Sequence, residues 1–523
     1  MINLKNDLST NIGKILFIIS VVFIFLIMSL DINNALIQID EYYTISLLQY
    51  SFIDSIRFTS INVHPPLYYI ILKIALKIIN TLNIGHTIFF LKMVSVIPYF
   101  IILLVSSTKI KKDYNWLTAG LFSITVLTMG TLPSYYITLR MYSWGLLFLV
   151  LSFISLKDVI EKSDIKSWAL LTIFTILGCY THYFLILDSI ILYLLLLLYI
   201  IFYKNKSPLK DGITKSFNTS EIKKWFASAI IAIVSYIPWL PTAIWQIKVV
   251  KSGYWVKPLD LNQLLRILSY FITNEKAVFI RIIGIIVLAI FIYLTIKFYL
   301  NYKKSNNKEN NAPSNINLKE NDYIYILIGM SIFLLTILIS LILNVVYRPV
   351  LVARYLIPSI GVLWLSISIL MSKIYDYKKL FAVLFILLML FSSLGMYGIM
   401  TAEPLSSENI FKDLNKKGSV IIFNDPYEFI KYEHRLPKAK LYLIKQDYGI
   451  YDYFIKKHSN LNEIEMDEVN DVAINNLNNK KRVYISIDQR HKVPDLNENL
   501  TQKEIFEFWN SKNTINKIKL KTT

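Results

Sequence analysis

The sequence predicts an all-helical membrane domain that crosses the bilayer many times, followed by a small α/β domain. Apolar runs of about 15–25 residues, the length that a helix needs to cross a bilayer, recur along the first 400 positions. Hydrophobic residues make up 55% of the 523 positions and charged residues only 17%, which is less charge than a soluble domain carries. From position 401 the composition changes to that of a soluble domain.

The predicted membrane domain has about eleven spans, beginning near the N-terminus. No small-x-small cleavage site follows residues 13–30, so we interpret this run as an uncleaved first span rather than a signal peptide. The expected spans are residues 13–30, 86–106, 116–134, 141–156, 167–181, 183–203, 225–247, 278–300, 322–346, 355–372 and 379–400.

The basic residues predict the orientation of these spans. The formal net charge is +19, and lysines gather in every second turn, at residues 107–115, 157–166, 204–224, 301–320 and 373–379. This is the positive-inside pattern, so topology rather than nucleic-acid binding explains most of the excess, and part of it suits anionic lipid head groups. The pattern predicts a plasma-membrane protein with a cytoplasmic N-terminus and an outer loop after the first span.

An adjacent pair of carboxylates, Asp40 and Glu41, lies in this first outer loop. A carboxylate is a natural general base for removing a proton from a hydroxyl as it attacks a carbon. The alternative is that the acids only stabilise the N-terminus of a helix over residues 42–48. Together with the motif that follows, the pair is the first candidate catalytic site.

The same loop ends in the run His64-Pro65-Pro66-Leu67-Tyr68-Tyr69. The two prolines fix two φ angles and keep the preceding residue extended, which gives His64 a rigid mount. His64 is a candidate hydrogen-bond donor to a phosphate or an acceptor; the alternative is that it only orients the loop. Residues 67–82 are apolar but carry two lysines four positions apart, which predicts an interfacial helix rather than a span.

Arginines lie at the outer ends of several expected spans. Arg140 lies where the third span leaves the membrane, and Arg348 and Arg354 lie near the outer end of the ninth. Charges near hydrocarbon are costly, so acids and arginines on one side predict a shared polar cavity there. Arginine binds phosphate oxygens through two parallel hydrogen bonds; the alternative is a side chain that only reaches the lipid head groups. The cavity suits a phosphate on a lipid tail together with a hydroxyl acceptor.

Aromatic and histidine side chains on the same side are the remaining candidates. Trp255 is a candidate for stacking on a sugar, with membrane anchoring as the alternative. Tyr43 and Tyr69 are further candidate contacts to the acceptor or the sugar. His182 and Asp188 lie near an outer turn, where we expect packing or local hydrogen bonding.

Other kinds of site are absent from the sequence. We find no nucleotide-binding glycine motif and no histidine or aspartate spacing typical of a metal site. The single cysteine, Cys179, excludes an intrachain disulfide. The energy for any transfer reaction must therefore come from an activated substrate.

The C-terminal part, residues 401–523, is expected to be a separate α/β domain after a membrane domain of residues 1–400, whose segment 31–85 forms the first outer loop. Three short runs rich in β-branched and aromatic residues predict strands at Ser419–Phe423, Lys440–Ile444 and 482–487, with helical patterns between them. An odd number of spans places this domain outside.

The acid pair and the His64-Pro65-Pro66-Leu67-Tyr68-Tyr69 run resemble the family 39 glycosyltransferases of the GT-C fold, which include protein O-mannosyltransferases and lipid A aminoarabinose transferases. Further matches over residues 1–400 are Arg140-Met141-Tyr142, Thr181-His182-Tyr183, Pro238-Trp239-Leu240-Pro241 and Arg354-Tyr355-Leu356-Ile357-Pro358. Relatives often have an acid just before the arginine, where this chain has Thr138-Leu139.

The resemblance implies transfer of a sugar from a polyprenyl-phosphate donor, such as undecaprenyl or dolichyl phosphate, to a hydroxyl of a protein, lipid or polysaccharide outside the cytoplasm, with inversion. Asp40 would be the general base and Glu41 its partner. Arg140 would hold the donor phosphate, and His64 stands where some relatives place a lysine near that phosphate. The scheme requires no metal or other cofactor.

Two rival functions fit a protein with many spans. A transporter or lipid flippase would normally place charges at mid-membrane on broken helices, often in paired repeats, whereas here the charges lie at one side and no halves match. A scaffold without enzymatic activity leaves the acid pair unexplained.

Overall fold

The computed structural model describes residues 2–33, 39–61, 63–84, 87–128, 135, 137–202, 219–252, 256, 258–272, 278–306, 320–374, 412–426, 428–429, 436–446, 462–488, 494–507 and 513–521. The chain divides into two compact units. The first comprises Met1–Ala35 and Tyr50–Gly398, and the second comprises Leu36–Gln49 and Ile399–Thr523. The prediction placed residues 36–49 in the membrane domain of residues 1–400, whereas the division into units groups them with the C-terminal part.

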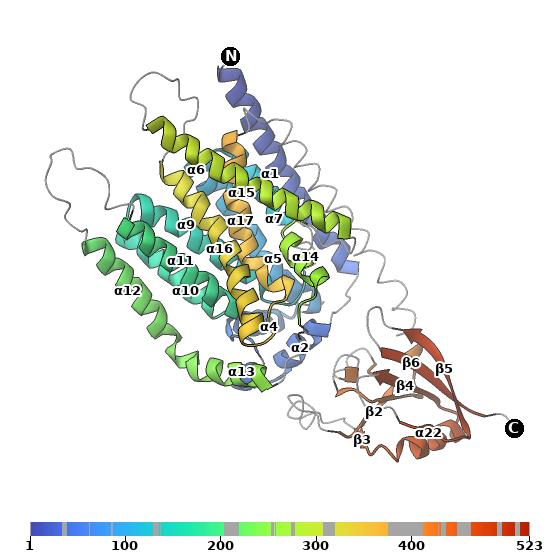
Figure 1. Cartoon of the computed structure of the whole chain (residues 1–523). Helices are drawn as coiled ribbons and strands as arrows, with labels where there is room; N and C mark the ends of the chain where they lie inside the picture. The colour runs from blue at the N-terminus through green and yellow to red at the C-terminus, as the bar shows by residue number, and fades with distance from the viewer. Residues whose placement is uncertain are drawn as a thin grey trace. The chain divides into compact units, whose positions relative to one another are not determined.

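The first unit is a bundle of apolar helices (Figure 1). Among the described residues, eight helical stretches are long and apolar enough to cross a membrane, so the protein is a multi-pass membrane protein. The helices of the bundle are α1 (Ile2–Asn33), α5 (Thr87–Val105), α7 (Trp116–Thr128), α9 (Tyr142–Glu161), α10 (Ile165–Cys179), α11 (Tyr183–Phe202), α12 (Thr219–Tyr236), α15 (Val278–Asn306), α16 (Glu320–Val346) and α17 (Ile357–Ile374).

Ten of the eleven expected spans coincide with these helices, and one of them differs from the prediction in its form. α10 has the 15 residues that were expected, displaced by two positions, and α7 covers the first 13 residues of its expected span, the rest of which lies outside the described residues. The span expected at 225–247 is interrupted by a 3-10 turn, η3 (Ile237–Trp239), before α13 (Leu240–Ser252), because Pro238 lies in this turn and lacks a backbone N–H. The eleventh expected span, 379–400, lies outside the described residues.

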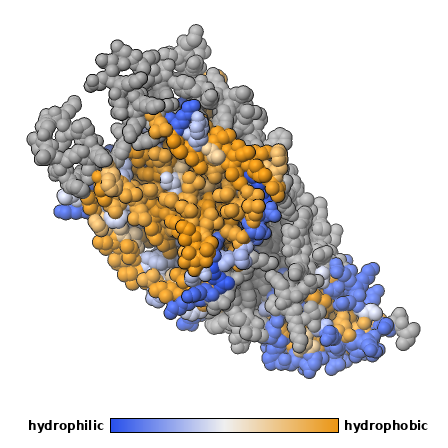
Figure 2. All heavy atoms as spheres, viewed as in Figure 1, coloured by the Kyte–Doolittle hydropathy of each residue, from blue (hydrophilic) through white to orange (hydrophobic). Residues whose placement is uncertain are grey.

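The centre of the bundle is formed by α9 and α17, which pack against each other and against α16, and α17 also packs against α7. Of the most apolar 18 residues within Ala353–Lys373, 94% are buried, against only 17% within Thr219–Lys251. Hydrophobic side chains such as Ile233 and Phe279 therefore face outward, and Figure 2 shows a largely hydrophobic surface over this unit. Such a surface is stable in lipid, because every backbone hydrogen bond is made inside the helix.

Two glycines bring α1 and α7 into close contact. A Cβ atom added to Gly120 would lie 2.1 Å from the carbonyl oxygen of Gly13, and one added to Gly13 would lie 2.2 Å from the carbonyl oxygen of Trp116. Small residues at a crossing point let helix backbones approach closely in a membrane, where van der Waals packing drives association. The absence of side chains at these two positions is therefore a packing requirement.

We expect Gly120→Ala to destabilise the protein by about 1–3 kcal/mol, because the new methyl group meets backbone atoms that cannot rotate away. The measurement is the apparent unfolding temperature in detergent micelles. The matched control is Gly178→Ala, whose Cβ would lie 3.8 Å from the side chain of Leu185, an ordinary contact distance. Equal unfolding temperatures of the two variants would contradict the expected clash.

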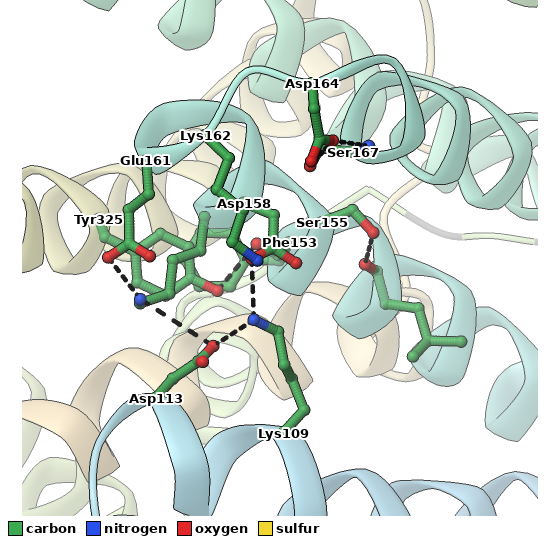
Figure 3. A network of polar contacts seen from close by, with 12 residues as sticks. Lys109, Asp113, Phe153, Ser155, Asp158, Glu161, Lys162, Asp164, Ser167 and Tyr325 are labelled. Carbon is green, nitrogen blue, oxygen red and sulfur yellow. Dashed lines mark hydrogen bonds and ion pairs between the residues drawn. The ribbon is translucent and has the colours of Figure 1, made fainter.

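Ion pairs connect α5 and α9 at one end of the bundle (Figure 3). α5 continues through a π-helical turn, η1 (Ser106–Ile110), into α6 (Lys111–Asp113). Lys109 contacts Asp113 at 2.7 Å and Asp158 at 2.8 Å, and Lys157 contacts Glu161 at 2.6 Å. The positive-inside pattern counts only the lysines, so it does not reveal that these lysines are paired with carboxylates.

The second unit contains a six-stranded mixed sheet of order β3-β2-β1-β4-β6-β5. The first four strands in this order are parallel, and β6 pairs antiparallel with β4 and β5. The sheet core contains Val420, Ile422, Val483 and Ile485, and α22 (Val469–Asn478) packs on it. The strands are β1 (Ser419–Phe423), β2 (Lys440–Ile444), β3 (Asn462–Ile464), β4 (Arg482–Asp488), β5 (Leu500–Glu507) and β6 (Asn513–Leu520).

The three strands predicted from apolar runs are confirmed as β1, β2 and β4. The other three were not predicted. β3 has only three residues, and β5 and β6 alternate apolar side chains with lysine, asparagine, glutamate and threonine, which have weaker strand signals.

Candidate functional site

The His64-Pro65-Pro66 run leads directly into helix α4 (Leu67–Thr81), whose N-cap residue is Pro66. The backbone N–H of Leu67 donates to the carbonyl oxygen of Tyr180 at 3.0 Å, which fixes the start of α4 to the turn between α10 and α11. The predicted helix over residues 67–82 is thus present. Its buried side chains include Tyr68 and Tyr69, so the candidate sugar contact Tyr69 lies inside the unit.

His64 and Arg140 are in direct contact although 76 positions separate them in the sequence. Nη2 of Arg140 lies 2.8 Å from Nε2 of His64, and both side chains are buried. A guanidinium group only donates hydrogen bonds, so Nε2 of His64 is the acceptor. The imidazole is therefore neutral and carries its proton on Nδ1. His64 orients Arg140, and only its Nδ1–H is left as a donor.

His182 lies beside this pair, in the turn between α10 and α11. Its ring centroid is 6.3 Å from that of His64, 5.7 Å from that of Tyr142 and 5.1 Å from that of Tyr355. The backbone N–H of Phe184 donates to Nδ1 of His182 at 3.2 Å. This contact requires an unprotonated Nδ1, so the neutral ring carries its proton on Nε2.

Arg354 joins the group from a 3-10 turn, η4 (Ala353–Leu356), just before α17. Its guanidinium carbon lies 6.0 Å from the ring centroid of Tyr355. Burial, then Arg140, His182 and Arg354, hold the pKa of His64 well below its ordinary value. Burial, then Arg140 and Arg354, lower the pKa of His182 to about 3. We refer to His64, Arg140, His182 and Arg354 as the histidine–arginine cluster; it combines two cations with two neutral imidazoles.

A chain of hydrogen bonds supports the loop before the cluster. Nε1 of Trp239 donates to the hydroxyl of Tyr183 at 3.1 Å, and that hydroxyl bonds to Gln246. The amide of Gln246 donates to the carbonyl oxygens of Thr59 at 3.1 Å and Ser60 at 2.9 Å, in the last turn of α3 (Phe52–Ile61). These carbonyls have no partner inside their own helix. The motifs around Trp239 and Tyr183 therefore hold the segment that leads to His64.

Arg348 has a different environment. Its Nη1 atom donates to the carbonyl oxygen of Val250 and, at 2.9 Å, to that of Lys251, both in the last turn of α13. An arginine at the C-terminus of a helix donates to the last carbonyl oxygens, which have no partner inside the helix, and its positive charge interacts favourably with the negative end of the helix dipole. A contact of Arg348 with a donor phosphate stays a prediction, and Trp255 lies outside the described residues.

Asp40 and Glu41 lie in the first turn of α2 (Ile39–Gln49), which belongs to the second unit. Glu41 is buried, Asp40 is half-buried, and the backbone carbonyl of Asp40 accepts a hydrogen bond from Thr44 at 3.1 Å. Acids in a first turn interact favourably with the helix dipole, as the alternative interpretation expected. Their catalytic role stays a prediction, as does the role of Tyr43 on the same helix.

Packing or local hydrogen bonding was expected of His182, and its ring contacts and the bond from Phe184 confirm this, whereas Tyr142 and Tyr355 were not singled out. Each of them belongs to one of the short motifs: Thr181-His182-Tyr183, Arg140-Met141-Tyr142 and Arg354-Tyr355. The shared signal was an aromatic or histidine side chain next to a candidate arginine or at a turn between spans. Among the described residues, no group of three or more metal-ligating side chains lies close enough to hold a metal ion.

Because the pKa of His182 is lowered in the folded chain, we expect this residue to make the protein less stable as the pH falls. Above pH 6.5 the ring is neutral in the folded and unfolded chains, so it contributes no pH dependence. Between pH 6.5 and about 3 only the unfolded chain binds the proton, so stability falls as pH falls. From pH 6.5 to 5 this amounts to about 2 kcal/mol.

The measurement is the apparent unfolding temperature of the wild type and of His182→Asn at pH 7.5 and pH 5. Asparagine can accept the bond from Phe184 but does not titrate. We expect a smaller loss between the two pH values in the variant; an equal loss in both proteins would exclude His182 as a source of the dependence.

Comparison with known protein families and with curated proteins finds no match to this sequence. Among solved structures, the chain is similar to the crystal structure of ArnT from Cupriavidus metallidurans bound to undecaprenyl phosphate. That similarity has a TM-score of 0.44 and 10% sequence identity, and it covers 97% of this chain and 98% of the other.

Proposed function

We infer that the protein is a membrane glycosyltransferase of the GT-C type, which transfers a sugar from a polyprenyl-phosphate donor to a hydroxyl acceptor. The observation that carries this proposal is the histidine–arginine cluster. Two guanidinium groups and two neutral histidines lie together inside a unit of membrane helices. The short sequence motifs that resemble family 39 glycosyltransferases supply all four segments that build it.

An anionic substrate with an apolar tail suits these surroundings. The charges that act on both histidines are the cations Arg140 and Arg354, so the local potential is positive. Arginine binds phosphate oxygens in a bidentate manner, and buried charge among membrane helices generally marks a substrate site. The apolar surface of the bundle suits the polyprenyl chain. Together these features support a lipid phosphate rather than a soluble anion.

The proposed reaction is a single displacement. The acceptor hydroxyl oxygen forms a bond to the anomeric carbon while the bond from that carbon to the phosphate oxygen breaks, which inverts the configuration. The hydroxyl proton passes to the carboxylate of Asp40, with Glu41 as its partner in the site. The phosphate gains negative charge as it leaves, and the fixed cation Arg140 stabilises that charge. No metal is needed for these steps.

The positive-inside pattern supports a cytoplasmic N-terminus in the plasma membrane, with the reaction and the C-terminal domain on the opposite side. The acceptor is then a protein, lipid or polysaccharide of the cell envelope. Arg354, as a second cation beside His182, is proposed to contact the same phosphate.

The proposal is tested by incubating the purified protein in lipid nanodiscs with a panel of polyprenyl-phosphate hexoses and pentoses and a membrane extract as the source of acceptor. We expect release of free polyprenyl phosphate that depends on the protein. Absence of release across the panel, with the protein folded, would overturn the proposed activity.

A transporter without transfer chemistry is the second candidate, and one observation favours it. Asp188 is fully buried in α11 and accepts a hydrogen bond from Thr336 of α16 at 2.5 Å. Ionisable side chains inside membrane spans often mark transport pathways. The same assay separates the two functions, because a transporter would bind or move a lipid-linked sugar without releasing its phosphate.

A further inference from the structure

The two nitrogen atoms of His182 have different environments. Nδ1 accepts a hydrogen bond from the backbone N–H of Phe184, in the first turn of α11. This bond fixes the tautomer, so Nε2 carries the proton. Nε2 is on the other side of the ring, and its N–H therefore points away from the start of α11.

The Nε2–H group makes no hydrogen bond to any of the described residues, although His182 is only 4% exposed. A donor nitrogen that has no protein partner, on a side chain that is almost fully buried, is available to a ligand. The rings of His64, Tyr142 and Tyr355 surround it, and the charges that act on it are Arg140 and Arg354. The charges that act on the ring are those of two arginines, which suits an anionic ligand.

We propose that His182 binds the donor by donating its Nε2–H to a phosphate oxygen of the polyprenyl-phosphate group, between the guanidinium groups of Arg140 and Arg354. This inference rests on the proposed function. His64 and His182 then have different roles. His64 accepts a hydrogen bond from Arg140 and so orients the guanidinium group, whereas His182 contacts the ligand.

A neutral donor has a specific advantage at this position. The sugar donor is a phosphodiester with one negative charge, and the leaving lipid phosphate has a charge of about −1.5 to −2 at pH 7. A protonated imidazole would add a third cation beside Arg140 and Arg354. Because the pKa of His182 is lowered to about 3, the ring adds a hydrogen bond without adding charge. The contact is thus available throughout the physiological pH range.

Two substitutions separate the two nitrogen atoms. His182→Asn places an acceptor near the position of Nδ1 and removes the outer donor, whereas His182→Gln places an N–H donor near the position of Nε2. The measured quantity is the dissociation constant of undecaprenyl phosphate for the full-length protein in nanodiscs. We expect the asparagine variant to bind about 10- to 100-fold more weakly, as for loss of a hydrogen bond to a charged group. The glutamine variant should stay within about 3-fold of the wild type.

A spectroscopic measurement on the wild type makes the test independent of how the variants fold. The chain has six histidines, so selective ¹⁵N-histidine labelling gives few signals. We expect the Nε2–H signal that is missing from His182→Gln to shift when undecaprenyl phosphate is added, and to stay unchanged with inorganic phosphate at the same concentration. A shift caused equally by inorganic phosphate would overturn the lipid as the ligand.

The two hypotheses fail in different ways. If wild-type protein neither binds undecaprenyl phosphate nor releases it from a sugar donor, the proposed function is wrong. If the wild type binds it but His182→Asn binds equally well, or the Nε2–H signal does not move, only the role of His182 is wrong.

Discussion

Replacing Arg140 by lysine is expected to lower the rate of sugar transfer by about 10²–10³-fold, the usual cost of removing one fixed donor to a developing negative charge. Lysine keeps the positive charge but loses the planar group that can bond to His64 through one nitrogen while its other N–H groups face a phosphate. The 2.8 Å contact with His64 fixes this orientation in advance. The measurement is release of polyprenyl phosphate per unit time from a sugar donor at saturating concentration.

Arg281→Lys is the matched control. Arg281 lies on α15 and donates to the carbonyl oxygen of Asn262 at 3.1 Å, so the same substitution changes an arginine outside the histidine–arginine cluster. We expect its transfer rate to stay within about 3-fold of the wild type. If Arg140→Lys kept the wild-type rate while both variants were folded, the histidine–arginine cluster would not be the phosphate site.

The sequence predicted the helices well because the bilayer imposes a simple rule. A span needs a continuous apolar run, and ten of the eleven expected runs are helices in the structure. The rule does not locate an interruption inside an apolar run, such as the turn at Pro238. It gives no information on the strands β5 and β6, whose polar residues form a sheet only through pairing with each other and with β4.

The candidate site was predicted less completely, for a different reason. The sequence predicted that His64, Arg140 and Arg354 lie on the same side of the membrane, but it did not predict which of them are in contact. Which of them touch depends on tertiary packing, such as the bond between Leu67 and Tyr180 that joins two distant segments. His182 was expected to take part in packing or local hydrogen bonding, but a histidine in the sequence does not indicate which of its ring nitrogens is bonded. That information comes only from the neighbouring backbone N–H of Phe184.

Asp40→Asn is expected to lower the turnover number by about 10²–10⁴-fold, the typical contribution of a general base. Asparagine has nearly the same shape but cannot take the proton of the acceptor hydroxyl. Because the histidine–arginine cluster is unchanged, the dissociation constant of undecaprenyl phosphate should stay within about 3-fold of the wild type. A loss of turnover without a loss of lipid-phosphate affinity would separate proton transfer from donor binding.

Asp54→Asn is the matched control for the alternative that Asp40 only stabilises a helix. Asp54 also lies in the first turn of a helix, α3, where it accepts a hydrogen bond from Ser51 at 2.8 Å. Asparagine remains a good residue at a helix start, so both variants should fold normally and the control should keep its turnover. If Asp40→Asn also kept the wild-type turnover, Asp40 would be a helix-stabilising acid, and the base would have to be another group. The first residue to examine would then be Glu41, which is buried in the same turn.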